Sequence, residues 1–264
     1  MSNPSLRRLA KDVAELAREP LDSCGIYYQH CDSDIRKATA VIRGPAGSAY
    51  DHGYYMFSFA FPDTYPAEPP KVRFLTSAIG LPTSRTDPGR RQCDGRRVRL
   101  HPNLYASGKV CLSLLGTWEG EPWTSCCTIC TLLLALQSIL DADPYMNEPN
   151  VRADDASHEP YNQAVMFHNL YDGLALFRRT TLQTLPVELQ SRLETDVANS
   201  VRVVIGRLKE RRSRPGGLVA REHWVDKYSF GTRSDYDLLL GLLESLQTST
   251  EPPKLTESVS SVPA

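Results

Sequence analysis

Residues 44–74 read GPAGSAYDHGYYMFSFAFPDTYPAEPPKVRF and carry the strongest structural signal in the chain. From Tyr55 to Phe61, every second residue is aromatic: Tyr55, Phe57, Phe59 and Phe61. A period of two is typical of a β-strand whose faces meet different surroundings. The prolines of residues 63–70 cannot lie inside a sheet, so they predict a turn that leads into another short strand at residues 71–76.

Two further β-rich runs precede this strand, GIYYQH at residues 25–30 and KATAVIRGP at residues 37–45. The second run is joined to the aromatic strand by the Gly-rich segment GPAGSAYDHG. Four sequential strands with short connections predict an antiparallel meander. The helical patterns before and after the meander place the chain in the α+β class.

Helical periodicity begins close to the N-terminus, in SLRRLAKDVAELAREP at residues 5–20. Its apolar face repeats at helical spacing: Leu6, Leu9, Val13 and Leu16. Ser5 is the predicted N-cap and Pro20 the stop. The opposite face carries Arg7, Arg8 and Lys11, which on their own read as a solvated face.

Four more helices are predicted after the meander, at residues 124–140, 158–180, 186–212 and 234–246. The first is strongly apolar and is expected to be mostly buried. Residues 77–99 show neither helical nor strand periodicity and predict an exposed loop. The composition after residue 248 is polar and rich in Ser and Pro, which predicts a disordered tail.

The 264 residues are 41% hydrophobic and carry a formal charge of −1. This length and composition allow a sizeable core with an extension. The two signs of charge are well mixed, so no global field indicates a nucleic acid or membrane partner. No apolar signal-peptide core or membrane-spanning stretch is visible, and we therefore expect a soluble protein of the cytoplasm, the nucleus or both.

Seven Cys residues in a chain without an export signal predict free thiols rather than a disulfide framework. One of them is therefore available as a nucleophile. Cys126, Cys127 and Cys130 form CCTIC, which with Cys93 would be a weak zinc motif. The paired spacing of a closed metal site is missing, so we expect small packed side chains and no bound metal.

The motif HPNLYASGKVCLSLL at residues 101–115 places Cys111 eight residues after Asn103. Together with the helix, meander, Pro-rich turn, Trp123 and long helix around it, this motif resembles the ubiquitin-conjugating enzymes. Residues 108–123, 136–150 and 235–246 are most similar to the Z-type members. The resemblance implies the ubiquitin-conjugating fold, with a core domain at residues 1–181, a helical C-terminal extension at 182–248 and a tail at 249–264.

The resemblance also implies a chemistry. Cys111 is expected to accept the C-terminal carbonyl of ubiquitin or a ubiquitin-like modifier as a thioester from an activating enzyme, and to pass it to a substrate lysine. ATP is consumed by the activating enzyme, so no cofactor is expected on this chain. Asn103 either donates a hydrogen bond to the thioester oxygen, which becomes negative during transfer, or only holds its own loop together. Glu148 occupies the position of the acidic residue that gates the site in this family. His101 and Pro102 are expected to be structural, with the His101 ring bonded to loop backbone.

Partner surfaces follow from the same resemblance. Arg7, Arg8 and Lys11 become candidate contacts for the activating enzyme. Four residues occupy the loops that face ubiquitin ligases in this family: Pro66, Ala67, Trp123 and Thr124. Ala67 replaces a common aromatic or apolar residue, and TSC follows Trp123 where Ser-Pro-Ala is usual, so the chain departs from the pattern that binds standard ligases.

The segment before the motif is longer than is usual in the family and is rich in arginine. It contains Arg85, Arg90, Arg91, Arg96, Arg97 and Arg99 against Asp87 and Asp94. Two interpretations remain open, a solvated loop and a patch that attracts acidic substrates or partners.

Two other functions compete with the conjugating enzyme. An inactive ubiquitin-binding scaffold would have the same fold, but such variants usually lack the Cys. A papain-like cysteine hydrolase would need a histidine paired with Cys111, and neither His158 nor His168 has a clear orienting partner in the sequence.

Overall fold

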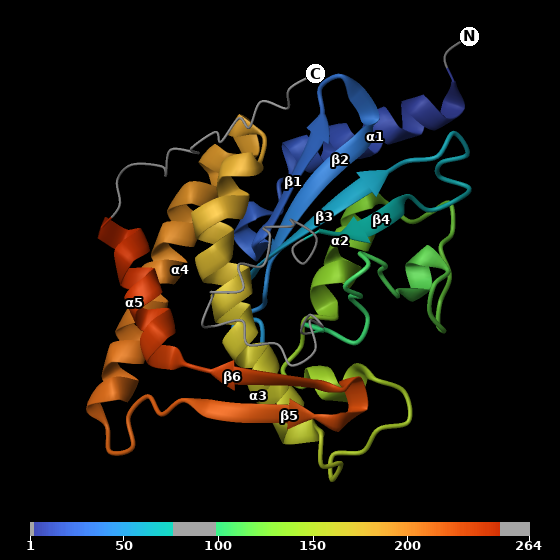
Figure 1. Cartoon of the computed structure of the whole chain (residues 1–264). Helices are drawn as coiled ribbons and strands as arrows, with labels where there is room; N and C mark the ends of the chain where they lie inside the picture. Colours follow the sequence, from blue (N-terminus) through green and yellow to red (C-terminus); the bar gives the residue numbers. More distant parts are fainter. Residues whose placement is uncertain (1–2, 76–98, 249–264) are drawn as a thin grey trace, which may run out of the picture.

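The computed structural model describes residues 3–75 and 99–248. Figure 1 shows a central sheet with helices on both of its faces. The helices are α1 (Pro4–Arg18), α2 (Ile129–Ser138), α3 (His158–His168), α4 (Val187–Ser213) and α5 (Tyr236–Thr248). The strands are β1 (Ile26–Cys31), β2 (Asp34–Arg43), β3 (Tyr54–Ala60), β4 (Lys71–Phe74), β5 (Arg221–Val225) and β6 (Phe230–Ser234). A π-helix, η6 (Asn169–Thr181), continues α3. Five short helical segments are also present in the described chain: η1 (Asp22–Cys24), η4 (Ser113–Leu115), η5 (Pro144–Asn147), η7 (Leu182–Thr184) and η8 (Asp226–Tyr228).

The predicted meander is confirmed: β1, β2, β3 and β4 are neighbours in chain order, and every pair is antiparallel. In β3, Phe57 pairs with Ala40 of β2 and Phe74 of β4. The aromatic face of β3 belongs to the core under α1 and α2, whereas Tyr54 and Met56 on its other face belong to a second core. Both faces of the sheet are therefore buried.

Helix α1 begins at Pro4, two residues earlier than a cap at Ser5 would place it, and its N-cap is Asn3. The Asn3 side chain accepts a hydrogen bond from the Ser5 amide at 3.0 Å. Pro4 occupies the first turn, where its missing N–H costs nothing. Ser5 is thus a buried residue of the helix and not its cap.

Helix α2 begins at Ile129, after a capping box between Thr128 and Thr131. Cys126 and Cys127 therefore lie in the preceding loop, and only Cys130 of the CCTIC motif is helical, whereas the sequence places all three in the first turns. The hydroxyl groups of the two threonines satisfy amide groups that would otherwise lack partners at the helix start. Its four buried residues are apolar, as predicted: Ile129, Leu132, Leu133 and Leu136.

The C-terminal helices cover the second face of the sheet. The predicted helix at residues 158–180 is α3 continued by the π-helical η6, and Phe177 of η6 stacks on Tyr54 of β3 at 5.2 Å between ring centroids. On α4, Asp196 accepts hydrogen bonds from Arg43 at 2.6 Å and from Tyr27 at 2.8 Å. Helix α4 therefore packs directly on the sheet, and α5 packs against α4 and η6.

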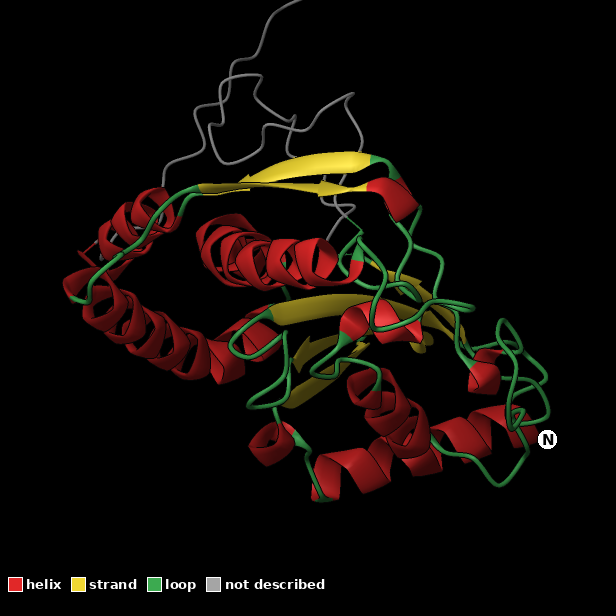
Figure 2. Ribbon diagram, turned by 90° about the horizontal axis from the view of Figure 1, so that it is seen from below, coloured by secondary structure: helices red, strands yellow, loops and turns green. Residues whose placement is uncertain are grey.

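A two-stranded hairpin, β5–β6, was not predicted from the sequence. It packs across α3, where the His168 ring and the Thr232 hydroxyl lie 2.8 Å apart. Figure 2 shows the hairpin, the α3–η6 helix, the sheet, and α1 with α2 as successive layers. The C-terminal extension thus reaches both the sheet and the loops that follow α2.

Among the described residues, no helix has the length and apolar character needed to cross a membrane. The predicted loop at residues 77–99, except for Arg99, and the predicted tail at residues 249–264 lie outside the described residues.

Candidate active site

The His101–Asn103 segment, called the HPN corner below, is a tight buried turn. The Leu104 amide donates to the His101 carbonyl at 3.0 Å, and the Asn103 amide donates to His101 Nδ1 at 2.9 Å. This is a bond from the ring to loop backbone, as the sequence analysis predicts. Burial, together with the positive charge of the nearby Arg99, lowers the pKa of His101 to about 3. The ring is therefore neutral near pH 7 and unsuited to act as a base.

Asn103 and Cys111 are joined by two hydrogen bonds. The Cys111 amide donates to the Asn103 carbonyl at 2.9 Å, and Asn103 Nδ2 donates to the Cys111 carbonyl at 3.0 Å. Asn103 is 6% exposed, and its buried Oδ1 has no hydrogen-bond partner within the described residues. The side chain ties the loop together and still keeps a second amide hydrogen.

The Cys111 residue is only 2% exposed. A buried thiol is less reactive than an exposed one, so attack by Cys111 requires the segments that cover it to move aside. The next segment braces this loop: the Thr117 hydroxyl donates to the Val110 carbonyl at 2.8 Å and accepts from the Leu112 amide at 3.0 Å. Thr117 thus holds both neighbours of Cys111, a role that the sequence analysis did not identify.

Glu148 lies at the C-terminal end of η5 and is partly buried. Its Oε2 accepts a hydrogen bond from the hydroxyl of Tyr228 at 2.7 Å. Tyr228 comes from η8, at the turn of the β5–β6 hairpin. The structure therefore brings a residue of the C-terminal extension onto the carboxylate that the sequence analysis singled out.

Arg99 links the HPN corner to this carboxylate region. Its guanidinium donates to the Pro102 carbonyl and lies over the rings of Tyr105 and Tyr228, at 4.0 Å and 5.1 Å from the ring centroids. Its own carbonyl accepts from the Tyr161 hydroxyl at 2.8 Å. Of the six arginines in the predicted insertion, Arg99 alone lies within the described residues.

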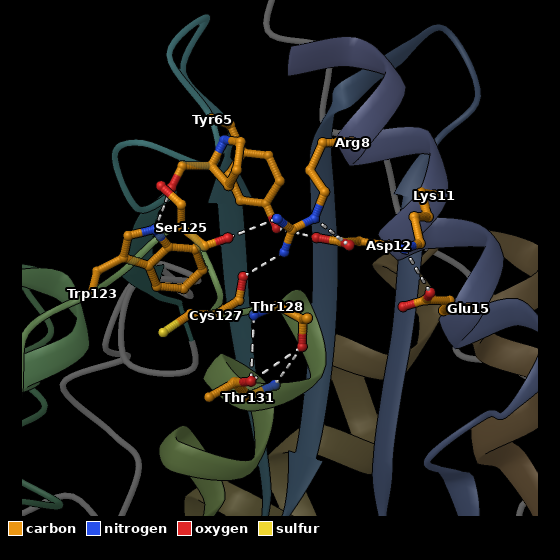
Figure 3. Close-up of polar contacts among 11 residues, drawn as sticks. Arg8, Lys11, Asp12, Glu15, Tyr65, Trp123, Ser125, Cys127, Thr128 and Thr131 are labelled. Carbon is orange, nitrogen blue, oxygen red and sulfur yellow. Dashed lines mark hydrogen bonds and ion pairs between the residues drawn. The ribbon is translucent and has the colours of Figure 1, made fainter. Parts of the chain in front are cut away.

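Arg8 has an internal role in the structure (Figure 3). Its guanidinium donates to Asp12 at 2.9 Å and to the carbonyls of Ser125 and Cys127 at 2.8 Å and 2.7 Å. The Asp12 carboxylate also accepts from the Tyr65 hydroxyl. Arg8 therefore fastens α1 to the loop before α2, which a run of basic residues in a helix does not reveal.

The other two basic residues of this face differ from Arg8. Arg7 is exposed, and the side chain of Lys11 is 70% exposed with an ion pair to Glu15 at 3.7 Å. Both remain on the outer surface of α1, where a partner protein can reach them.

The two predicted ligase-facing loops meet in the structure. Trp123 Nε1 donates to the Pro66 carbonyl at 2.8 Å, and the Trp123 ring lies beside Tyr65 with its centroid 6.0 Å away. Ala67 and Thr124 are exposed on either side of this contact. The four residues named from the sequence therefore form one surface.

A groove of about 580 Å³ adjoins the Cys111 loop between β4 and residues 107–117. It is lined by Val110, which precedes Cys111, by Thr117, and by basic side chains including Lys71 and Lys109. The groove presents both apolar surface and positive charge next to the thiol segment.

The six described Cys residues are free thiols, as predicted, and Cys93 lies outside the described residues. Within residues 3–75 and 99–248, no three His, Cys, Asp or Glu side chains are grouped as metal ligands would be.

Comparison with known proteins gives a family match. A family model described as ubiquitin-conjugating enzyme matches residues 8–169, a range that includes Asn103, Cys111 and Glu148. Ubiquitin-conjugating enzyme E2 Z of Xenopus tropicalis is 31% identical over 166 residues, which cover 62% of this chain and 47% of the relative. The human E2 Z is 32% identical over 162 residues, 61% of this chain and 41% of the relative. The aligned part thus spans less than half the length of these curated relatives.

Solved structures with the same family name are also similar. The E2 domain of a Toxoplasma gondii ubiquitin conjugating enzyme shows a TM-score of 0.44 at 26% identity and covers 61% of this chain and 93% of its own. Human ubiquitin-conjugating enzyme E2 G1 shows a TM-score of 0.40 at 26% identity, covering 53% of this chain and 97% of its own.

Proposed function

The chain belongs to the ubiquitin-conjugating enzyme family, and on this premise we propose that it carries ubiquitin or a ubiquitin-like modifier as a thioester on Cys111 and transfers it to a lysine amine. Its partners are then the modifier, an activating enzyme, protein substrates and, where one is needed, a ligase. The observation that supports this proposal best is the pair of hydrogen bonds between Asn103 and Cys111, which holds the thiol segment against the HPN corner.

The first step is an exchange between thioesters. The thiolate of Cys111 attacks the carbonyl carbon that joins the modifier to the activating enzyme. A new S–C bond forms on Cys111, and the bond to the activating enzyme breaks, with its thiolate as the leaving group. Since one thioester replaces another, the step needs neither a catalytic base nor a cofactor on this chain.

The second step forms an amide. The substrate amine attacks the thioester carbon, and negative charge develops on the carbonyl oxygen. The new N–C bond is kept, the S–C bond to Cys111 breaks with the thiolate as the leaving group, and the proton released from nitrogen passes to water. An amide N–H is a suitable donor for the developing oxyanion, and Asn103 keeps one amide hydrogen beyond its bond to Cys111. In this proposal the carboxylate of Glu148, the counterpart of the family's acidic gate, accepts an N–H of the incoming amine and orients it.

The experiment is a charging assay with ubiquitin or another modifier, the matching activating enzyme and ATP. We expect an adduct that reduction removes, that Cys111→Ala abolishes, and that Cys111→Ser converts into a reduction-resistant oxyester. Cys126→Ala is the matched control, because Cys126 is an exposed free thiol outside the site. If no modifier and activating enzyme produce an adduct, the proposal is wrong and an inactive modifier-binding scaffold takes its place.

A further inference from the structure

Tyr228 of the C-terminal hairpin contacts Glu148, a residue 80 positions earlier in the chain. We propose that Tyr228 is a positioning residue for amide formation, which holds the Glu148 carboxylate in the orientation that receives the substrate amine. The β5–β6 hairpin then contributes a residue to the site at which the modifier is transferred. This inference rests on the proposed function.

The position of the Tyr228 ring is set by aromatic packing. It contacts Tyr161 at 5.0 Å and stacks on Phe230 at 6.4 Å between ring centroids, with an interplanar angle of 13° in the second pair. Tyr161 is 0% exposed and Phe230 1% exposed, so both supports are fixed in the core. The hydroxyl therefore reaches Glu148 from a ring that has little freedom to turn away.

The hairpin that carries Tyr228 is anchored on both sides of its turn. Val225 and Phe230 pair across the hairpin and are both buried in the core that contains the aromatic face of β3. The Lys227 amide donates to the Ser157 hydroxyl at 3.2 Å. These contacts hold the turn against the segment between α2 and α3, where Glu148 lies.

Tyr228 acts as a donor throughout the neutral pH range. Burial raises its pKa, and the hydrogen bond to Glu148 raises it further. The phenol thus keeps its proton and donates it to Oε2. A carboxylate offers about four acceptor positions, so the Tyr228 bond leaves capacity for an N–H of the substrate.

Arg99 connects this pair to the HPN corner. It contacts the Tyr228 ring and donates to the Pro102 carbonyl, so a chain of contacts runs from the corner through Arg99 and Tyr228 to Glu148. The carboxylate is therefore placed relative to the loop that holds Cys111, and one of the links comes from the C-terminal extension.

The test compares wild type with Tyr228→Phe, which keeps the ring packing and removes the hydroxyl. Each protein is first charged with modifier, and single-turnover discharge is then measured with free lysine and, separately, with water as the nucleophile. We expect unchanged charging, unchanged hydrolysis, and a loss of about tenfold in discharge to lysine, the order of one charge-assisted hydrogen bond. Tyr145→Phe is the matched control, because the Tyr145 hydroxyl bonds a different carboxylate, Asp155, near the same loop.

The Glu148→Ala background separates positioning from general support of the fold, because alanine leaves no acceptor for the Tyr228 hydroxyl. If Tyr228 acts through Glu148, adding Tyr228→Phe to Glu148→Ala causes no further loss in discharge to lysine. An equal loss in both backgrounds, or a parallel fall in hydrolysis, would overturn the positioning role, as would wild-type discharge by Tyr228→Phe. A wild-type chain that never forms a thioester instead overturns the proposed function, and this role with it.

Discussion

The side-chain amide of Asn103 lies 3.0 Å from the carbonyl oxygen of Cys111, and the Cys111 amide donates back to the Asn103 carbonyl at 2.9 Å. The two residues are eight positions apart, and these bonds close the loop between them. Asn103 thus has a structural role in the resting molecule, whatever it does during transfer.

Replacing Asn103 by Asp tests that role, because the change keeps the shape and exchanges a donor for an acceptor facing the Cys111 carbonyl. We expect the free energy of unfolding to fall by about 1–3 kcal/mol. Chemical denaturation measures this loss, and single-turnover assays measure the rates of charging and transfer. A larger loss in transfer than in charging supports an oxyanion role for Asn103, whereas equal losses indicate that the residue only holds the loop.

A substitution of Thr117 tests whether the loop around Cys111 limits access to its thiol. Thr117→Val keeps the volume and removes the hydroxyl that holds Val110 and Leu112. We expect Cys111 to be alkylated faster and stability to fall by about 1–2 kcal/mol. Thr117→Ser, which retains the hydroxyl, is the control and should resemble wild type. Unchanged alkylation in Thr117→Val would show that another contact closes the loop.

Substitutions of Arg8 and Lys11 should affect different properties, the stability of the fold and the binding of the activating enzyme. Arg8→Ala removes three hydrogen bonds and leaves the buried Asp12 carboxylate without its cation, so we expect a loss of about 3 kcal/mol in thermal or denaturant unfolding. Lys11→Glu changes an exposed side chain, and stability should stay within about 0.5 kcal/mol of wild type.

The complementary measurement for this pair is the rate of thioester formation. If α1 contacts the activating enzyme, Lys11→Glu slows charging more than it slows transfer to lysine. Equal charging by Lys11→Glu and wild type would remove Lys11 from that surface.

The lowered pKa of His101 predicts that the free energy of unfolding depends on pH. Its pKa is about 3 in the folded protein and about 6.5 when unfolded, so between these values the unfolded chain binds a proton that the native state does not. Protonation of His101 therefore does not reduce the free energy of unfolding above pH 6.5. Below pH 6.5 this free energy falls with decreasing pH, by up to about 1.4 kcal/mol per pH unit.

Urea unfolding between pH 7 and pH 4 checks the His101 prediction. We expect His101→Gln to show a shallower decline than wild type over this range. His223→Gln is the comparison, because burial lowers the pKa of His223 as well, in a different part of the fold. If the His101→Gln slope matches the wild-type slope, protonation of His101 does not control acid stability.

Most of the secondary structure follows from local sequence patterns. The alternation in β3 and the helical repeats of α4 depend only on neighbours in the chain, and each was predicted within a few residues. The β5–β6 hairpin was missed because its five-residue strands mix polar and apolar side chains, and a two-stranded hairpin is marginal by itself. Its packing across α3 supplies the missing stability.

Part of the candidate site was also predictable from local sequence patterns, and part of it was not. Local patterns predicted the meander, the HPN corner and the candidate thiol Cys111, because spacing along one loop specifies which residue types can meet. The packing of distant segments was needed to show that Arg8 braces α1 against the loop before α2 and that Tyr228 contacts Glu148. These contacts join residues 80 or more positions apart, and they depend on how both faces of the sheet are covered, which no local pattern encodes.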